Sequence, residues 1–138
     1  MKDIFITYCS AKKDESLRGT NVKTTPDRLY ASSRIRRFID ACRERKVAWA
    51  IFSDKYGILF PTSKAGWYDK APESVTEEEF ERLVRDFDQK LRAYDEIYFY
   101  YERESFHELY RRLLARTALS GRIKTIEYME DAAGWQVK

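Results

Sequence analysis

The sequence predicts an α/β fold, a three-layer sandwich with helices on both faces of a mostly parallel, four-stranded sheet. Two observations predict it. Four short apolar runs alternate along the chain with three longer segments whose apolar residues recur every three or four positions, and this is the pattern of strands joined by helical crossovers. The 138 residues hold no internal repeat, low-complexity tract or linker. We therefore expect a single α/β domain over residues 1–138.

The first half of the chain predicts a strand, a long loop, a helix and a second strand. Residues 2–8 are apolar and β-branched, and residues 9–26 are polar. A loop of that length either binds a ligand or closes over one, or it is a mobile surface loop. Residues 29–46 predict a helix, capped by Ser32 or Ser33, and residues 47–52 the second strand. The helix has one apolar stripe, formed by Ile35, Phe38, Ile39 and Cys42.

The other face of this helix carries six basic side chains. The simplest interpretation is a solvated face with cations near the carboxyl end, where the helix dipole favours them. An anion-binding patch is the less favoured interpretation. The six are Arg34, Arg36, Arg37, Arg43, Arg45 and Lys46.

The second half predicts an irregular stretch over residues 61–74 and then alternating helices and strands. Residues 76–94 form a helix that Thr76 and Glu79 begin as a capping box. Residues 96–101 form the third strand. Residues 105–119 form the third helix, which Ser105 and Glu108 begin as a second capping box. This helix contains His107 and ends before Gly121. Residues 123–128 form the fourth strand, and residues 130–138 have room for one short turn.

Composition excludes several classes of protein. The net charge is only +3, so an anionic partner is permitted but not required. Two distant cysteines without a signal-peptide pattern predict a reducing, cytoplasmic setting. One histidine and two cysteines cannot form a structural zinc site, and we expect no metal or other cofactor. No apolar run is long enough to span a membrane. The oligomeric state stays open.

Polar residues follow the first two predicted strands directly. The first strand runs into Cys9-Ser10-Ala11-Lys12-Lys13, and the second into Ser53-Asp54-Lys55-Tyr56-Gly57. The carboxyl ends of neighbouring parallel strands meet at one edge of a sheet, which is where ligands bind in open α/β folds. The two turns are therefore expected to face a shared pocket.

These turns offer several chemical groups, each with a structural alternative. Cys9 is a nucleophile if a nearby cation lowers its pKa, or else a small buried apolar residue. Lys12 and Lys13 hold a phosphate or carboxylate, or are simply solvated. Asp54 is a candidate for acid–base work, or pairs with Lys55. Ser10 adds an anion nest, and Gly57 permits a backbone shape that other residues resist. No glycine-rich phosphate loop and no Ser-His-Asp set is present.

The spacing of these blocks resembles a family of small uncharacterised proteins. The matching pattern is Cys9-Ser10-x-Lys12-Lys13, Leu29-Tyr30-x-Ser32, Trp49-x-Ile51-x-Ser53-x-Lys55-Tyr56-Gly57-Ile58-Leu59-x-Pro61 and Tyr68-Asp69, within residues 3–70. That family is in turn similar to the peroxide-stress YaaA family and to the catalytic domain of archaeosine synthase. The resemblance implies a parallel-sheet core like that of uracil-DNA glycosylases, and a pocket for a base or nucleotide.

Carried over residue by residue, the resemblance places binding at the matching positions of the four blocks: Ser10, Lys12, Lys13, Tyr30, Ser32, Ser53, Lys55, Tyr56, Gly57 and Tyr68. Catalytic work would fall to Cys9 or Asp54. Two departures argue against the tRNA amidination chemistry of archaeosine synthase. Asp14 and Glu15 stand where that enzyme has Pro-Tyr, and Asp54 occupies a position that is usually small.

Three functions remain as hypotheses. The first is a nucleobase- or nucleotide-binding protein, as a small enzyme acting on a base, a modified base or a nucleic acid, with Tyr56 stacking on the base. The second is a non-catalytic DNA- or RNA-binding protein of the YaaA type. Its phosphate contacts would come from Arg34, Arg37, Arg111, Arg112, Arg116, Arg122 and Lys124. The third is a structural or interaction module with an exposed apolar patch.

Overall fold

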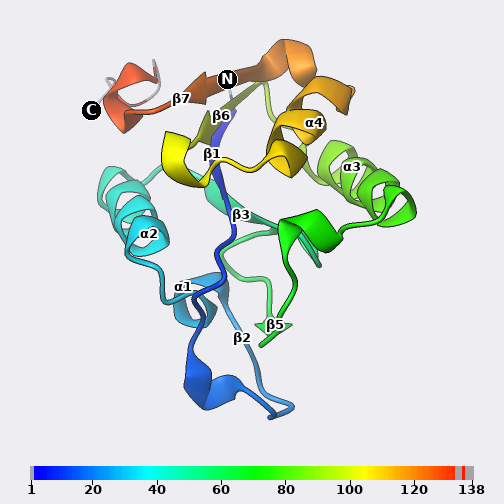
Figure 1. The fold of residues 1–138 in the computed structure, drawn as a ribbon. Coiled ribbons are helices and arrows are strands. Elements are labelled where there is room, and N and C mark those ends of the chain that lie inside the picture. Colours follow the sequence, from blue (N-terminus) through cyan, green and yellow to red (C-terminus); the bar gives the residue numbers. More distant parts are fainter. Residues whose placement is uncertain (1, 133–134, 136–138) are drawn as a thin grey trace.

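The computed structural model describes residues 2–132 and 135, and its main feature is a five-stranded sheet (Figure 1). The order is β4-β3-β1-β6-β7. The central strand β1 is parallel to β3 and to β6, and β6 is parallel to β7, which confirms the four predicted strands as a parallel set. The bounds are β1 Asp3–Tyr8, β3 Trp49–Ser53, β4 Gly57–Leu59, β6 Glu96–Tyr100 and β7 Ile123–Ile126.

The prediction of only four strands is wrong, because β4 adds a fifth and makes the sheet mixed. Gly57 has φ +80°, a conformation that other residues rarely adopt. The chain therefore reverses after Ser53, and β4 pairs antiparallel with β3. Three apolar residues are too few to show a strand period, so the sequence alone hid this edge strand.

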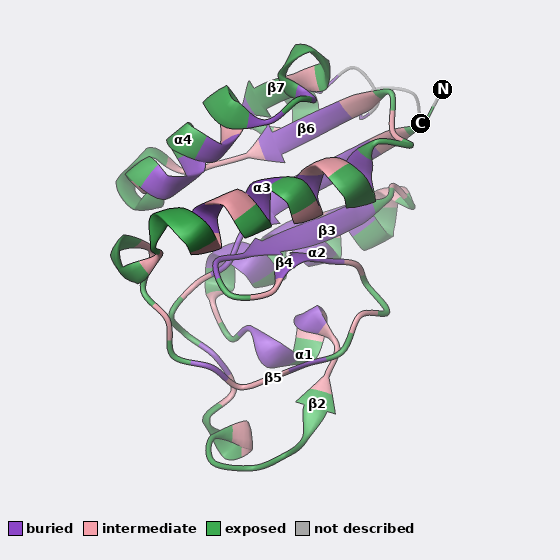
Figure 2. Cartoon of the chain, turned by 90° about the vertical axis from the view of Figure 1, so that its right-hand side faces the viewer, coloured by how far each residue is buried: buried purple, intermediate pink, exposed green. Residues whose placement is uncertain are grey.

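Helices pack on both faces of the sheet. Ile4, Ile6 and Tyr8 contribute to one core cluster, which contains the buried stripes of α3 (Glu77–Leu91) and α4 (Glu108–Arg116). Phe5 and Cys9 contribute to the other, which contains the stripe of α2 (Ser33–Arg45). Figure 2 shows buried residues along the strands behind α3. The alternation of β1 side chains between two helix-covered faces is the expected period of a covered strand.

The first predicted helix, over residues 29–46, begins later than expected and is preceded by a separate helical turn. A single turn, α1 (Pro26–Leu29), ends at Tyr30, whose extended backbone forms an isolated bridge with Lys13. The long helix α2 then begins after Ser32, whose Oγ accepts a hydrogen bond from the Ile35 N–H at 3.3 Å. Ser32 is thus the cap, and Lys46 ends the helix in the left-handed conformation.

The capping box of α3 is confirmed, and that of α4 is wrong. The Thr76 N–H donates to Glu79 Oε1 at 2.9 Å, and Thr76 Oγ1 accepts from the Glu79 N–H at 3.1 Å. In α4 the cap is His107, whose Nδ1 accepts from the Leu109 N–H at 2.9 Å. His107 therefore precedes the helix, Thr117 caps its end, and Gly121 lies in a separate 3-10 turn. A histidine ring can replace a cap hydroxyl as acceptor, which cap statistics do not anticipate.

Below the carboxyl edge of the sheet lies a small lobe, formed by residues 10–30 and 61–70 (Figures 1 and 2). It contains α1 and a two-stranded antiparallel sheet of β2 (Lys23–Thr24) and β5 (Ala65–Gly66). The loop predicted over residues 9–26 thus folds into a 3-10 turn, Glu15–Leu17, and a strand. In the tail, Met129–Asp131 forms the expected turn, while residues 133–134 and 136–138 lie outside the described residues.

Candidate functional site

The two predicted turns meet at the carboxyl edge of the sheet. Cys9 follows β1, and its N–H donates to the Phe52 carbonyl of β3 at 2.9 Å. Asp54 follows β3, and its N–H donates to Cys9 Sγ at 3.4 Å. The thiol also lies 3.7 Å from the Tyr110 hydroxyl of α4. Cys9 and Asp54 are buried at 6% and 2% exposure, so the contact lies inside the protein.

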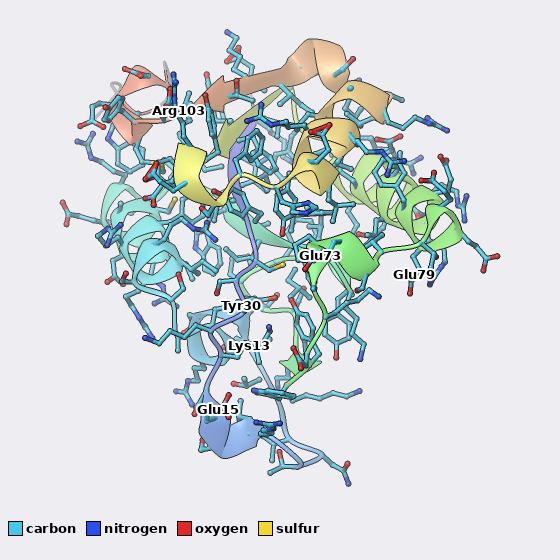
Figure 3. All side chains as sticks on the ribbon, viewed as in Figure 1. Lys13, Glu15, Tyr30, Glu73, Glu79 and Arg103 are labelled. Atoms are coloured by element: carbon cyan, nitrogen blue, oxygen red, sulfur yellow. The ribbon has the colours of Figure 1, made fainter. Side chains whose placement is uncertain are left out.

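Lys13 lies beneath this contact rather than in the solvent. Its Nζ donates to the Ser10 carbonyl at 2.9 Å and lies 4.1 Å from the centre of the Tyr68 ring. Figure 3 shows Lys13 beside Tyr30 where β1 enters the small lobe. Burial lowers the pKa of Lys13, and the nearby Cys9 and Asp54 act in the opposite direction. Lys13 is therefore a buried cation that balances the acidic groups of the site.

A chain of hydroxyl groups connects β3 with the small lobe. The Ser53 hydroxyl donates to Tyr68 Oη at 2.9 Å, and Tyr68 Oη lies 2.7 Å from Tyr30 Oη. Ser53 Oγ also accepts from the N–H groups of Lys55 and Tyr56, at 3.1 and 3.0 Å. Because both acceptor positions of Ser53 are used, its proton points to Tyr68. This network fixes the turn that carries Asp54.

The Asp54 carboxyl has an unused acceptor. Among the described residues, its buried Oδ1 has no hydrogen-bond partner. Burial raises the pKa of Asp54, against a hydrogen bond from Cys9 and the charges of Lys13 and Lys70. A buried carboxyl without a partner is costly unless something supplies a donor. A raised pKa also moves this carboxyl toward the range useful for proton transfer.

Cys9 is a thiol rather than a thiolate at neutral pH. Burial, followed by the Asp54 charge, raises its pKa from 9.0 to about 11. The neighbouring Lys13 does not bring this pKa below its ordinary value, and the arrangement favours the structural interpretation of Cys9 over the nucleophilic one.

Two pockets open on either side of the Cys9–Asp54 contact, in place of the single predicted hollow. The larger, of about 710 Å³, is the α3 pocket, lined by Asp54, Lys55, Tyr56, Asp69, Lys70, Ser74, Glu79, Arg82, Leu83, Arg85, Asp86 and Gln89. The smaller, of about 520 Å³, is the Cys9 pocket, lined by Tyr8, Cys9, Ser10, Ala11, Lys12, Ser32, Ser33, Arg34, Pro72, Glu102, Ser105 and Tyr110. Because Pro72 lines one and Ser74 the other, the turn Pro72–Ser74 lies between them.

The predicted site residues divide among these places. Ser10, Lys12 and Ser32 line the Cys9 pocket with Cys9 itself, and Lys55 and Tyr56 line the α3 pocket with Asp54. A second group is buried in the network beneath them, formed by Lys13, Tyr30, Ser53 and Tyr68. Gly57 begins β4 against Asp86, so its role is in the backbone turn rather than in ligand contact.

Arg34 is the main residue that the sequence interpretation misplaced. It is 8% exposed and not on the solvated face of α2. Its guanidinium donates to Thr7 Oγ1 at 2.9 Å and to the carbonyls of Tyr8 and Cys9 at 3.0 and 3.2 Å. The signal was its position four residues before Phe38, which puts both on one side of the helix. Tyr110, on α4, also contacts Cys9, and no local sequence pattern indicates this contact.

Most cations expected to contact nucleic-acid phosphates are engaged elsewhere. Arg34 is buried, so it does not belong to an exposed basic surface. Arg112 and Arg116 pair with Glu77 and Glu81, both at 2.9 Å. Arg37 and Lys124 pair with Glu102 and Glu96 at 3.4 and 3.2 Å, while Arg122 donates to two carbonyls. DNA or RNA binding therefore stays a prediction.

Over residues 2–132 and 135, no three His, Cys, Asp or Glu side chains lie together as ligands for a metal ion. In the same part of the chain, every helix is too short or too polar to cross a lipid bilayer.

No family model, curated protein or solved structure matches this chain. The resemblance to YaaA and to archaeosine synthase therefore stays a prediction.

The buried thiol gives a first testable expectation. Alkylation of Cys9 by iodoacetamide should be slow at pH 7 and accelerate toward pH 11, because only the thiolate reacts. Since the folded pKa lies above the ordinary 9.0, the thiol contributes stability below pH 9 that is lost as the pH rises to about 11, by about 3 kcal/mol. Peptide mass mapping at each pH measures the rate.

Cys42 supplies the internal control for this experiment. It is fully buried, and burial raises its pKa further, so it should react more slowly than Cys9 at every pH. Rapid alkylation of Cys9 at pH 7 would instead restore the nucleophile interpretation.

Proposed function

We propose that the protein binds a nucleobase-containing ligand in the α3 pocket, and that a nucleotide fits this pocket better than a free base or a nucleoside. The observation that carries the proposal is the unpartnered, buried Oδ1 of Asp54, because this residue lines a pocket whose lining also includes cations without an ion-pair partner. Among the described residues, Lys55, Arg82 and Arg85 form no ion pair. A nucleotide combines N–H donors on its base with a phosphate anion, which matches this pairing of an acceptor with cations.

Different residues that line the α3 pocket would contact different parts of the nucleotide. Asp54 accepts a hydrogen bond from the edge of the base, which supplies the donor that Oδ1 lacks. The half-buried ring of Tyr56 is available for stacking on the base. Arg82 and Arg85 lie in the middle of α3 and hold the phosphate, because a guanidinium fork fits two phosphate oxygens.

Acid–base chemistry on the bound base belongs to the same proposal. The raised pKa of Asp54 supports it, because a carboxyl that titrates closer to neutral pH transfers protons more effectively. Cys9 contacts the Asp54 backbone and positions this group. The location at the carboxyl ends of β1 and β3, where open α/β sheets bind ligands, supports the site.

Three finer points complete the proposal. The sequence resemblance supports a base or nucleotide as ligand and a three-layer core of the uracil-DNA glycosylase type. Two free, buried cysteines, Cys9 and Cys42, support a cytoplasmic location, because free thiols persist in a reducing compartment. The favoured partner is a small molecule.

Calorimetric titration with the four common ribonucleosides and their monophosphates tests the proposal. At least one monophosphate should bind, and Asp54→Asn should weaken both the nucleotide and its nucleoside. The double variant Arg82→Ala/Arg85→Ala should weaken the nucleotide by at least about tenfold and leave the nucleoside unchanged.

Arg92→Ala is the matched control for the arginine variant. Arg92 is an exposed cation at the end of α3 and lies outside the pocket lining, so nucleotide affinity should not change. Absence of binding by every base, nucleoside and nucleotide would overturn the proposal. Equal loss in the Arg92 variant would place the phosphate elsewhere.

A further inference from the structure

The Cys9 pocket contains a buried cation without a counter-charge. Arg34 forms no ion pair with a described carboxylate, and its three hydrogen bonds go to a hydroxyl and two carbonyls. Its Nε–H and one Nη1–H donate to no described residue. The guanidinium also lies 4.0 Å from the centre of the Tyr8 ring. A charge buried against neutral groups is costly, and an anion in the pocket would compensate it.

Two segments of the chain with unpaired backbone N–H groups contribute residues to the same pocket. The groups of Ser33 and Arg34 belong to the first turn of α2, where no intrahelical acceptor exists. Those of Ser10, Ala11 and Lys12 follow β1, and no described residue accepts from them. The α2 dipole adds positive potential at its start. Residues with two sets of unused donors thus line one pocket together with Arg34.

The other charges around the pocket leave it positive. Lys12 is exposed at the rim and contributes an ammonium group. Glu102 is the one carboxylate among the lining residues described, and its Oε2 already accepts from Tyr100 Oη at 2.8 Å and from Arg37 at 3.4 Å. Hydroxyls of Ser32 and Ser33 supply neutral donors, whereas the Ser105 hydroxyl is hydrogen-bonded to Tyr8 Oη at 2.7 Å.

We propose that the Cys9 pocket is a phosphoryl-anion site, in which Arg34, Lys12 and the N–H groups of residues 10–12 and 33–34 bind a phosphate group. Tetrahedral oxyanions suit this site because they accept hydrogen bonds from several directions at once. The site lies across the Cys9–Asp54 contact from the α3 pocket. The phosphate site does not require a nucleobase in its ligand, and this proposal does not depend on whether a nucleotide binds in the α3 pocket.

Titration with inorganic phosphate, followed by ¹H–¹⁵N NMR at constant ionic strength, tests the proposal. The amide signals of residues 10–12 and 33–34 should shift together and saturate, while chloride produces no such shift. A nucleoside that fills only the α3 pocket should leave these signals unchanged, so the two proposals can fail separately. Absence of a saturating shift in both segments would overturn the phosphate site.

Two variants locate the charge. Lys12→Glu, at an exposed position, should weaken phosphate binding by about tenfold or more. Arg34→Lys keeps the positive charge but loses the planar guanidinium group, and should weaken phosphate binding by a similar factor. The dispersion of the amide signals shows whether this variant is folded. Lys64→Glu is the control: it is exposed, lies outside the lining, and should bind phosphate as the parent does. Equal weakening by Lys64→Glu would show only long-range attraction and overturn the site.

The source of the phosphate follows from two further ligands. A phosphate monoester, such as phosphoserine, presents a terminal dianion, whereas a dinucleotide without terminal phosphates presents only a diester. Shifts of the same amides with the monoester alone assign the site to a small phosphorylated ligand. Shifts with the dinucleotide as well assign it to a nucleic-acid backbone.

Discussion

Replacing Gly57 with alanine is expected to lower the free energy of unfolding by about 3 kcal/mol, combining left-handed backbone strain with the loss of a charge-assisted hydrogen bond. Gly57 has φ +80°, and a Cβ there would lie 2.1 Å from Asp86 Oδ2. That oxygen accepts the Ile58 N–H at 2.7 Å, and Asp86 also pairs with Lys90. Moving Asp86 to make room would break one of the two hydrogen bonds that join β4 to α3, the other being from Lys90 to the Ile58 carbonyl. Urea unfolding followed by circular dichroism measures the change.

Two other glycines separate the causes. Gly19 has φ +76° with no atom within 4 Å of the added Cβ, so Gly19→Ala should show only the backbone cost of about 1–2 kcal/mol. Gly121 has neither feature, so Gly121→Ala should be nearly neutral. A Gly57 variant no less stable than the Gly19 variant would mean that Asp86 relaxes without cost.

Replacing Arg34 with methionine is expected to cost about 3 kcal/mol of stability. The change removes three hydrogen bonds and leaves the Thr7 hydroxyl and the carbonyls of Tyr8 and Cys9 with fewer donors. Part of this loss is offset, because methionine removes the cost of burying a cation that has no ion-pair partner. Thermal and urea unfolding measure it, in buffer free of phosphate so that binding does not contribute.

Arg36→Met is the matched control for this prediction. Arg36 lies two residues further along α2 and is exposed, so its loss should change stability by less than about 0.5 kcal/mol. If both variants unfold alike, Arg34 is not what holds the end of β1.

The large periodic elements could be predicted from sequence, and the exceptions have local causes. Four parallel strands and three amphipathic helices followed from apolar spacing over many residues. The helix expected from residue 29 begins only at Ser33, because the extended backbone of Tyr30 pairs with Lys13, which is distant in sequence. The three-residue strand β4 depends on one glycine conformation.

The candidate site was located more reliably than it was described. Strand ends placed Cys9 and Asp54 at one edge, and they are in contact. Burial could not be predicted in the same way. A charged residue in a sequence is normally expected at the solvent-exposed surface, so Lys13 and Arg34 were expected there. Both are buried instead, because other segments supply carbonyl groups and aromatic rings as their partners. Division of the hollow in two depends on the turn Pro72–Ser74, which no sequence pattern indicated.

The hydroxyl chain from Ser53 through Tyr68 to Tyr30 has a consequence for how the protein melts. It joins the end of a core strand to both segments of the small lobe. Separation of the lobe from the sheet would leave three hydroxyl groups without their hydrogen-bond partners and would expose the Lys13 side chain to water. Lobe and sheet should therefore unfold cooperatively as one unit, and the small lobe should not fray ahead of the rest.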